Sequence, residues 1–183
     1  ADLVSGRDDI EPFEVSVTDF TDLLYAGGIR KAQLMPVVGH ETNMAYGWAV
    51  GPHRNRELAL RAWARAKDTF RQMGIARKGM IIHHDRDSVY LSYEWLRELL
   101  IEDRVRISYA LRGATDSTMM EAFNSSFKRE GESLFVEAAD VAGLREVVAG
   151  QMRYYNRERR HSALGYESPV VYTRSLRRQQ EEL

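Results

Sequence analysis

The sequence predicts an α/β fold, in which a mixed sheet of three antiparallel strands followed by two parallel strands is flanked by helices. Two observations lead to this prediction. The first part of the chain holds three apolar runs separated by short turns, which is typical of an antiparallel meander. The later part alternates short apolar runs with helical patterns, which favours parallel strands joined by helices. With 183 residues, the chain is long enough for one domain with a substantial core.

The three strands of the meander are expected at 13–20, 31–40 and 44–51. In the first of them apolar and polar residues alternate, and Asp19 falls at the end of the apolar face. Pro36 lies within the second run and has no amide hydrogen to donate, so it predicts either an edge strand or a bulge.

After the meander, apolar residues recur at helical spacing. The first helix is expected at 55–74, with Asn55 as its N-cap and Gly74 as its C-cap. Further helices are expected near 93–103, at 116–134 and at about 138–158, with strands at 79–84 and 105–111 between them. The residues expected to face the core are Ala59, Trp63, Ala66, Phe70, Met73, Trp95, Leu96, Leu99, Leu100, Met120, Phe123, Phe127, Leu134, Val141, Leu144, Val148, Met152 and Tyr155.

Composition and charge exclude several classes of protein. The net charge of −1 argues against a generally basic nucleic-acid-binding protein. The segment 151–161 is nevertheless locally basic, which indicates either phosphate contacts or a solvated helix end. The chain has no cysteine, so disulfides and thiol catalysis are excluded. No apolar run reaches the ~20 residues of a membrane helix, and the first residues lack a signal-peptide core. We therefore expect a cytoplasmic protein with no membrane partner.

Carboxylates are expected to meet at one edge of the sheet. Asp19 ends the first strand and Asp85 follows the fourth, so the two face each other if these strands are parallel neighbours. Glu121 lies on the helix after the fifth strand, and Lys128 lies two turns further along the same face. Converging carboxylates repel one another, and divalent cations such as Mg²⁺ remove this repulsion because they prefer oxygen ligands. Two such ions can bind the attacking and leaving oxygens of a phosphoryl transfer.

Each of these residues also has an ordinary structural explanation. Asp19 can form a turn at a strand end, with Asp22 as the functional residue instead. Asp85 can cap the following segment, and Asp87 offers a rival register two residues on. A single helix glutamate such as Glu121 is more often exposed than a ligand. The residues alone therefore leave the site as one of several interpretations.

Four sequence blocks resemble the integrase-core domain of bacterial insertion-sequence transposases. "VTDFTDL" (17–23) resembles the family's first-strand TDITY block, and "HHDRDSVY" (83–90) resembles its HSDRGSQY block. "DSTMMEAFNSSFKRE" (116–130) is similar to its DNAxxESFxxxLKxE helix, and "YYNRERRHSALGYESPVVY" (154–172) is similar to its closing YNxxRxHxxLGYxTPxxY signature. The blocks occur in family order and span roughly residues 13–175.

The resemblance implies a ribonuclease-H-like fold and DNA breakage and joining by a DDE triad with two Mg²⁺ or Mn²⁺ ions. Matched to the family motifs, the triad is Asp19, Asp85 and Glu121, and the basic residue that approaches the DNA end is Lys128. The implied partners are DNA, as element ends and target, and further copies of the chain in a homodimer or higher assembly. No small-molecule substrate is implied, and the protein would associate with the nucleoid when on DNA. Further candidates for phosphate contacts are Arg112, Arg86 and Arg160.

The sequence departs from the family pattern at three places. Gly39 stands where the family usually has Asp, and Asp87 replaces the Gly of its DRG turn. We expect Asp87 to tolerate a positive φ and to add a negative charge near the metals. The segment 112–116 is a residue shorter than the family loop. These departures leave one alternative open, an inactive DNA-binding or assembly module. A further alternative is a ribonuclease-H-like nuclease that uses the same metals and cuts without joining.

The expected organisation is a loose polar lead-in at 1–12, an integrase-like catalytic core at 13–160 and a C-terminal tail at 161–183. The tail is expected to pack on the core through Tyr155, Leu164, Tyr166 and Pro169. Whole transposases of the family carry an upstream helix-turn-helix region. We therefore expect the chain to be a catalytic core from a longer protein or a truncated relative.

Overall fold

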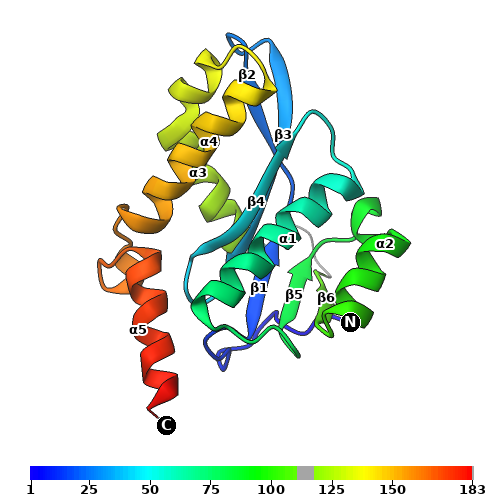
Figure 1. Cartoon of the computed structure of the whole chain (residues 1–183), viewed down its shortest axis with the longest axis vertical. Helices are drawn as coiled ribbons and strands as arrows, with labels where there is room; N and C mark the ends of the chain where they lie inside the picture. Colours follow the sequence, from blue (N-terminus) through cyan, green and yellow to red (C-terminus); the bar gives the residue numbers. More distant parts are fainter. Residues whose placement is uncertain (111–117, 183) are drawn as a thin grey trace.

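The computed structural model describes residues 1–110 and 118–182. These residues form one six-stranded mixed sheet flanked by helices (Figure 1), so the predicted α/β fold class is confirmed. The strands are β1 (Val15–Thr18), β2 (Thr21–Tyr25), β3 (Arg30–Gly39), β4 (Ala45–Gly51), β5 (Ile81–His84) and β6 (Arg106–Tyr109). The helices are α1 (Arg56–Met73), α2 (Tyr93–Leu96), α3 (Thr118–Glu137), α4 (Val141–Arg157) and α5 (Pro169–Glu181), with short helical turns at Ser88–Leu91, Arg97–Glu102 and Ser162–Leu164.

The strands pair in the predicted order, antiparallel first and then parallel. β3 lies inside the sheet. It pairs with β4 along one side, and with β2 and β1, one after the other, along its other side. β1 also pairs in parallel with β5, and β5 pairs in parallel with β6. β1 is therefore the strand at which the sheet changes from antiparallel to parallel pairing.

The first strand, predicted at 13–20, begins at Val15 and stops at Thr18 before the chain resumes pairing as β2. By the register of β1 against β3, the next residue, Asp19, would pair with Pro36. A proline has no amide hydrogen for the ladder. The hydroxyl of Thr18 instead donates to the Pro36 carbonyl oxygen at 2.7 Å. The ladder is therefore interrupted at the residue that carries the first candidate carboxylate.

Pro36 marks an irregular stretch of β3 and not a sheet edge. β3 is paired on both sides, and Pro36 lies opposite Trp48 of β4. The register between β3 and β4 shifts just after this point, between Val37 and Val38. Of the two expectations for this proline, the bulge is confirmed and the edge strand is wrong.

Two apolar cores cover the two faces of the sheet. One contains buried side chains of α3 and α4 together with Val15 and Val17 of β1. The other contains those of α1 and α2, and includes the fully buried rings of Trp63 and Trp95. No described helix is both long and apolar enough to cross a bilayer.

The prediction for α1 is confirmed down to its caps. The Asn55 side chain accepts a hydrogen bond from the Leu58 amide at 2.9 Å, and Gly74 ends the helix with a φ of 66°. Two residues expected in the core are exposed instead, Leu100 at 47% and Leu134 at 51%.

Both errors have a local cause. Leu100 lies in the π-helical turn Arg97–Glu102, whose wider winding changes the direction of side chains relative to an α-helix. In α3 the inward position belongs to Phe135, which stacks on Phe127 with the ring centroids 5.5 Å apart. Gly131 makes room for this ring, because a Cβ there would lie 2.3 Å from it.

The first residues of the chain are hydrogen-bonded to the sheet. The Tyr109 amide at the end of β6 donates to the Ala1 carbonyl oxygen at 3.1 Å. The Leu3 amide donates to the Ser108 hydroxyl at 2.8 Å, and Val4 is buried in the core of α3 and α4. The segment therefore covers the outer side of β6.

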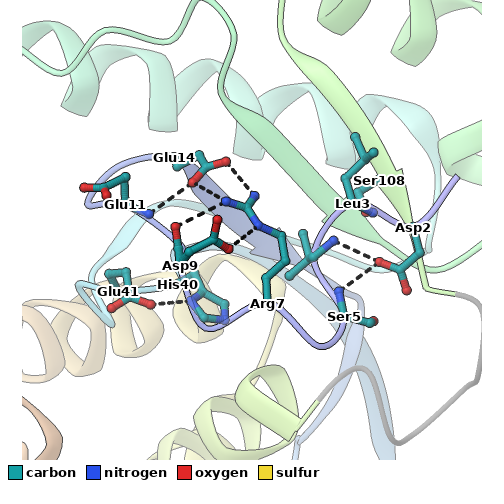
Figure 2. A network of polar contacts seen from close by, with 11 residues as sticks. Asp2, Leu3, Ser5, Arg7, Asp9, Glu11, Glu14, His40, Glu41 and Ser108 are labelled. Atoms are coloured by element: carbon teal, nitrogen blue, oxygen red, sulfur yellow. Dashed lines mark hydrogen bonds and ion pairs between the residues drawn. The ribbon is translucent and has the colours of Figure 1, made fainter.

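An arginine joins this segment to the start of β1 (Figure 2). Arg7 donates to both carboxylate oxygens of Glu14, at 2.6 and 3.1 Å, and to Asp9 at 2.8 Å. These bonds hold the pKa of the Glu14 carboxyl below its usual value. The neighbouring His40 and Glu41 pair at 2.7 Å just after β3.

The C-terminal tail contains one helix, α5, that the sequence analysis did not predict. Leu164 and Pro169 are buried, and the Arg177 side chain donates to the Met73 carbonyl oxygen of α1 at 3.2 Å. Tyr166, expected among the packing residues, is 70% exposed. The division of the chain at residues 12 and 160 stays a prediction.

Gly39 ends β3 at a close contact. A Cβ at this position would lie 2.2 Å from the Thr42 hydroxyl oxygen and 2.7 Å from the Tyr46 ring. The hydroxyl groups of Thr42 and Tyr46 are 2.8 Å apart and both residues are buried. The position at which the resembled family carries Asp therefore requires glycine in this chain.

We predict that Gly39→Ala lowers the free energy of unfolding by about 1–3 kcal/mol, because the added methyl group overlaps Thr42 and Tyr46. Urea denaturation followed by circular dichroism measures the change. The matched control is Gly150→Ala in α4, where the nearest atom to a new Cβ is 3.8 Å away. The control should be neutral or stabilising by up to about 1 kcal/mol. Equal stability of the two variants would contradict the prediction.

Candidate functional site

Asp19 and Asp85 come together at the carboxyl ends of two neighbouring parallel strands. Val17 of β1 pairs with His83 of β5, so each aspartate follows this pair by two residues on its own strand. The condition named in the sequence analysis, that the first and fourth expected strands are parallel neighbours, is therefore met. Open α/β sheets form ligand sites at this kind of edge.

The two carboxylates interact electrostatically. Asp19 is half-buried, and burial together with the charge of Asp85 raises the pKa of the Asp19 carboxyl to about 6. The amide of Phe20, which donates to Asp19 Oδ1 at 2.8 Å, opposes this rise, as does the charge of Arg54. The folded chain thus makes the ionised form of Asp19 less favourable than in water.

Each aspartate keeps one carboxylate oxygen available. Asp19 Oδ1 accepts from Phe20, and Asp85 Oδ1 accepts from the Asp87 amide at 2.9 Å. Within residues 1–110 and 118–182 no group donates to the Oδ2 atom of either residue. Carboxylate oxygens without hydrogen-bond donors at two neighbouring strand ends fit a hard divalent cation, which would also neutralise the repulsion between the two carboxylates.

His84 holds the backbone at Asp85. Its Nδ1 lies 2.7 Å from the Asp85 carbonyl oxygen, and its Nε2 accepts from the Trp95 indole at 3.3 Å. Since the carbonyl can only accept, the proton of the neutral ring lies on Nδ1. Burial lowers the pKa of His84 to about 4, although the Asp85 carbonyl opposes this shift. The ring also stacks on Tyr90 with the centroids 4.2 Å apart, so the strand end is rigidly supported.

Asp87 behaves differently from the expectation. Its φ is −57° and not positive, because its side chain caps the turn Ser88–Leu91 by accepting from the Val89 amide at 2.9 Å. Arg54 donates to the other oxygen at 2.8 Å. Burial raises the pKa of Asp87, but the bonds from Val89 and Arg54 outweigh it and the pKa is lowered. The extra negative charge is therefore neutralised by an arginine.

Arg54 is a site residue that the sequence analysis missed. It lies in the loop before α1, and its guanidinium carbon is 5.1 Å from the centroid of the Phe20 ring. It is ion-paired with Asp87 and close enough to lower the pKa of Asp19. No local sequence pattern marks it, since the loop approaches the strand ends only through the packing of α1.

The rival carboxylate Asp22 is already paired. It accepts from the Gln33 side chain at 2.6 Å and lies 3.2 Å from the Lys31 ammonium group. These contacts lower the pKa of Asp22. A carboxylate held by two side-chain donors is a poorer metal ligand than Asp19.

Glu121 and Lys128 lie on α3 as predicted, two turns apart. Glu121 is exposed in the first turn of the helix, directly after the undescribed segment 111–117. Among the described residues no group of three His, Asp or Glu side chains is close enough to hold one metal ion. Lys128 donates to the Thr21 hydroxyl at 3.1 Å, and Thr21 is two residues from Asp19. The lysine thus points toward the first strand end, whereas the glutamate is not gathered with the two aspartates.

The remaining candidates for phosphate contacts are dispersed. Arg86 is exposed, with its guanidinium carbon 5.9 Å from the centroid of the Tyr109 ring. Arg160 is exposed as well, whereas the ion-paired arginine of the closing signature is Arg159, whose Nε donates to Glu130 at 2.9 Å. Arg112 lies outside the described residues.

Comparison with known sequences gives one family match and two relatives. Residues 104–169 match the family model described as the integrase core domain. An uncharacterized 31 kDa protein of insertion element IS600 from Shigella sonnei is 30% identical over 173 residues, or 88% of this chain. The transposase for insertion element IS904 from Lactococcus lactis is 33% identical over 94 residues, or 50% of this chain. The chain spans only 57% and 36% of the lengths of these two proteins.

Solved structures show the same fold at low sequence identity. The simian T-cell lymphotropic virus intasome contains a chain that matches 91% of this one with a TM-score of 0.73 and 15% identity, over 56% of its own length. The catalytic core domain of HTLV-2 integrase, solved with magnesium in a dimeric form, matches 90% with a TM-score of 0.64 and 14% identity, over 97% of its length. The fold is therefore the ribonuclease-H-like fold of integrase cores.

We predict that Asp19→Asn stabilises the chain by about 1–2 kcal/mol at pH 7 in EDTA, because it removes a carboxylate whose ionised form the fold disfavours. The pKa of the Asp19 carboxyl is higher in the folded chain than in the unfolded chain. Above the folded-state pKa its ionisation therefore lowers the free energy of unfolding. At a pH low enough to protonate Asp19 in both the folded and the unfolded chain, this penalty disappears. The gain should accordingly fade as the pH is lowered toward about 4. Thermal melting at both pH values measures it.

Asp22→Asn serves as the matched control. This substitution removes a paired carboxylate three residues away and should bring no gain at either pH. If Asp19→Asn melted at or below the wild-type temperature at pH 7, the raised pKa of Asp19 would be refuted.

Proposed function

We propose that this chain, which matches the integrase core domain over residues 104–169 and has the ribonuclease-H-like fold, is the catalytic core of a DDE transposase. In this proposal it breaks and joins DNA strands with two Mg²⁺ or Mn²⁺ ions held by Asp19, Asp85 and Glu121. The observation that carries the proposal is the meeting of Asp19 and Asp85 at the ends of parallel β1 and β5. The similarity to the transposase from Lactococcus lactis supports it.

The two aspartates suit a divalent cation by their chemistry. Both offer an oxygen that no described group occupies, and the charge of one raises the pKa of the other, so a cation would relieve an existing repulsion. When bound, a pair of such ions supplies electrophilic stabilisation of the attacking and leaving oxygens at phosphorus. The HTLV-2 integrase core was solved in complex with magnesium, which supports the same choice of metal here.

The protein's own groups would position the DNA. Lys128 lies beside Thr21 and can reach a phosphate near Asp19, while Arg86 and Arg160 are exposed and Arg112 remains a candidate by sequence. Phosphate contacts of this kind fix the position of a duplex without reading its sequence. His84 and Trp95 keep the Asp85 backbone in place and touch no substrate in this proposal.

The proposed partners are DNA, as element ends and target, and further copies of the chain in a homodimer or higher assembly. The dimeric and trimeric forms of the HTLV-2 integrase core support assembly. We place this activity in the cytoplasm, at the nucleoid.

One observation favours a second candidate, an inactive DNA-binding or assembly module. Glu121 is exposed, and the described residues contain no three-residue metal cluster. A nuclease that cuts without joining would use the same aspartates, so analysis of the DNA products distinguishes it from a transposase.

We predict that Mn²⁺ binds the wild-type chain saturably and raises its melting temperature, and that Asp85→Asn abolishes both effects. Calorimetric titration and thermal melting measure them. In the presence of Mn²⁺, cleavage of duplexes that carry element ends should fall at least about 100-fold in Asp19→Asn, Asp85→Asn and Glu121→Gln, because each removes a proposed metal ligand. Asp22→Asn is the matched control and should keep wild-type activity.

The outcomes separate the candidate functions. Metal binding with cleaved and joined products supports the transposase, and cleaved products alone support the nuclease. If neither wild type nor variants responded to millimolar Mn²⁺ with DNA present, the inactive module would replace the proposal.

A further inference from the structure

A groove lined by arginines runs along β4, the edge strand on the far side of β3 from the candidate aspartates. It has a volume of about 790 Å³ and lies between the first half of β4, the C-terminal half of α1, and helices α4 and α5. Figure 1 shows α4 and α5 on one side of β4 and α1 in front of the sheet. Six arginines line it, and no Asp or Glu does: Arg65, Arg153, Arg157, Arg174, Arg177 and Arg178.

Three of these arginines have free guanidinium groups. Arg153 and Arg157 on α4 and Arg174 on α5 are exposed, and among the described residues their side chains make no hydrogen bond or ion pair. By contrast, Arg65 donates to the Trp48 carbonyl oxygen at 2.9 Å, and Arg177 is paired with a glutamate of its own helix. Arg65 and Arg177 are therefore held by contacts within the protein, whereas the guanidinium groups of the three free arginines are available to a ligand.

Most of the positive charge of the groove is not compensated locally: among the described residues, Arg177 is the one lining arginine that is ion-paired with a carboxylate. Burial lowers the pKa of Arg65, and the neighbouring charges of Arg61 and Arg145 lower it further. The whole chain has a net charge of −1, so this concentration of arginine is a local feature and does not reflect the composition. A concentration of arginines without carboxylate partners favours an anionic ligand.

We propose that this groove binds the phosphate backbone of a DNA duplex as a second site, separate from the edge that holds Asp19 and Asp85. Arginine presents a planar guanidinium group whose two N–H donors match two phosphate oxygens. Because the groove arginines lie on three helices, α1, α4 and α5, they can contact successive phosphates of one duplex. The choice of DNA over RNA rests on the function proposed above. The basic groove itself is independent of catalysis.

Other occupants fit the groove less well. A twofold interface centred on the groove would bring the arginine-lined patches of two copies together, and like charges across an interface are unfavourable. A flat anionic surface would not enter a concave groove between helices. The phosphate backbone of a DNA duplex is both negatively charged and convex, so it matches a basic, concave groove.

The test compares the wild type with a triple variant, Arg153→Gln, Arg157→Gln and Arg174→Gln. Fluorescence anisotropy in EDTA measures binding to a duplex of about 30 base pairs with arbitrary sequence over a series of salt concentrations. We expect the variant to lose at least about tenfold in affinity at ~100 mM salt, and the slope of log affinity against log salt to fall in magnitude by about 2–3, as three lost phosphate contacts require.

The matched control is the triple variant Arg30→Gln, Arg104→Gln and Arg106→Gln, whose three arginines are exposed and lie outside the groove. It carries the same change in net charge and should keep the wild-type slope. All six positions are exposed, so melting temperatures should stay close to wild type, and a variant that melts early is replaced by the corresponding single substitutions.

Three results would overturn the proposal. The groove variant and the control could weaken binding equally, which would mean a general charge effect. Sedimentation could show that the groove variant changes the oligomeric state of the free chain, which would make the groove an interface between copies. An RNA duplex could bind at least about tenfold more tightly than the DNA duplex. Because EDTA removes divalent ions, failure of the proposed catalysis would leave these measurements unaffected.

Discussion

The candidate site depends on a missing hydrogen bond. Pro36 cannot donate to the residue opposite it, so the ladder between β1 and β3 stops at Thr18 and leaves Asp19 outside regular pairing. On its other side β1 continues in parallel with β5, which carries Asp85 to the same level. One imino acid in an interior strand thus determines where the first carboxylate can turn away from the sheet. The two cores on either face then hold both strand ends in place.

The electrostatics of the site are only partly balanced by the protein. Arg54 neutralises Asp87 and lowers the pKa of Asp19, yet Asp85 and burial still raise that pKa to about 6. A carboxylate with a structural role has a different environment. Asp103, which is buried beneath α1, accepts hydrogen bonds from the Trp63 indole at 2.7 Å and from Arg77 at 2.8 Å. The contrast between a fully paired aspartate and an underpaired one indicates which of them the fold keeps available for a ligand.

Regular features could be predicted from the sequence because they follow from local physics. The α1 caps, the apolar stripes and the alternation of strands and helices depend on residues close together in the chain, and they are confirmed. The misplaced Leu100 and Leu134 depend on a π-helical turn and on the space beside Gly131, which periodicity does not contain. The position of Asp19 and Asp85 at the same edge of the sheet was predictable from the strand order. Arg54 and the basic groove were not, because they form where segments distant in sequence pack together.

The attachment of the first residues to β6 has a practical consequence for handling the protein. Ala1 is bonded to Tyr109, Tyr109 pairs with His84, and the next residue after His84 is Asp85. Anything that precedes Ala1 in the chain, such as an affinity tag or a fluorescent protein, would therefore start beside β6, close to the strand end that carries Asp85. The end of α5 lies at the bottom of the view in Figure 1, away from β5 and β6, so a label placed there keeps clear of that edge.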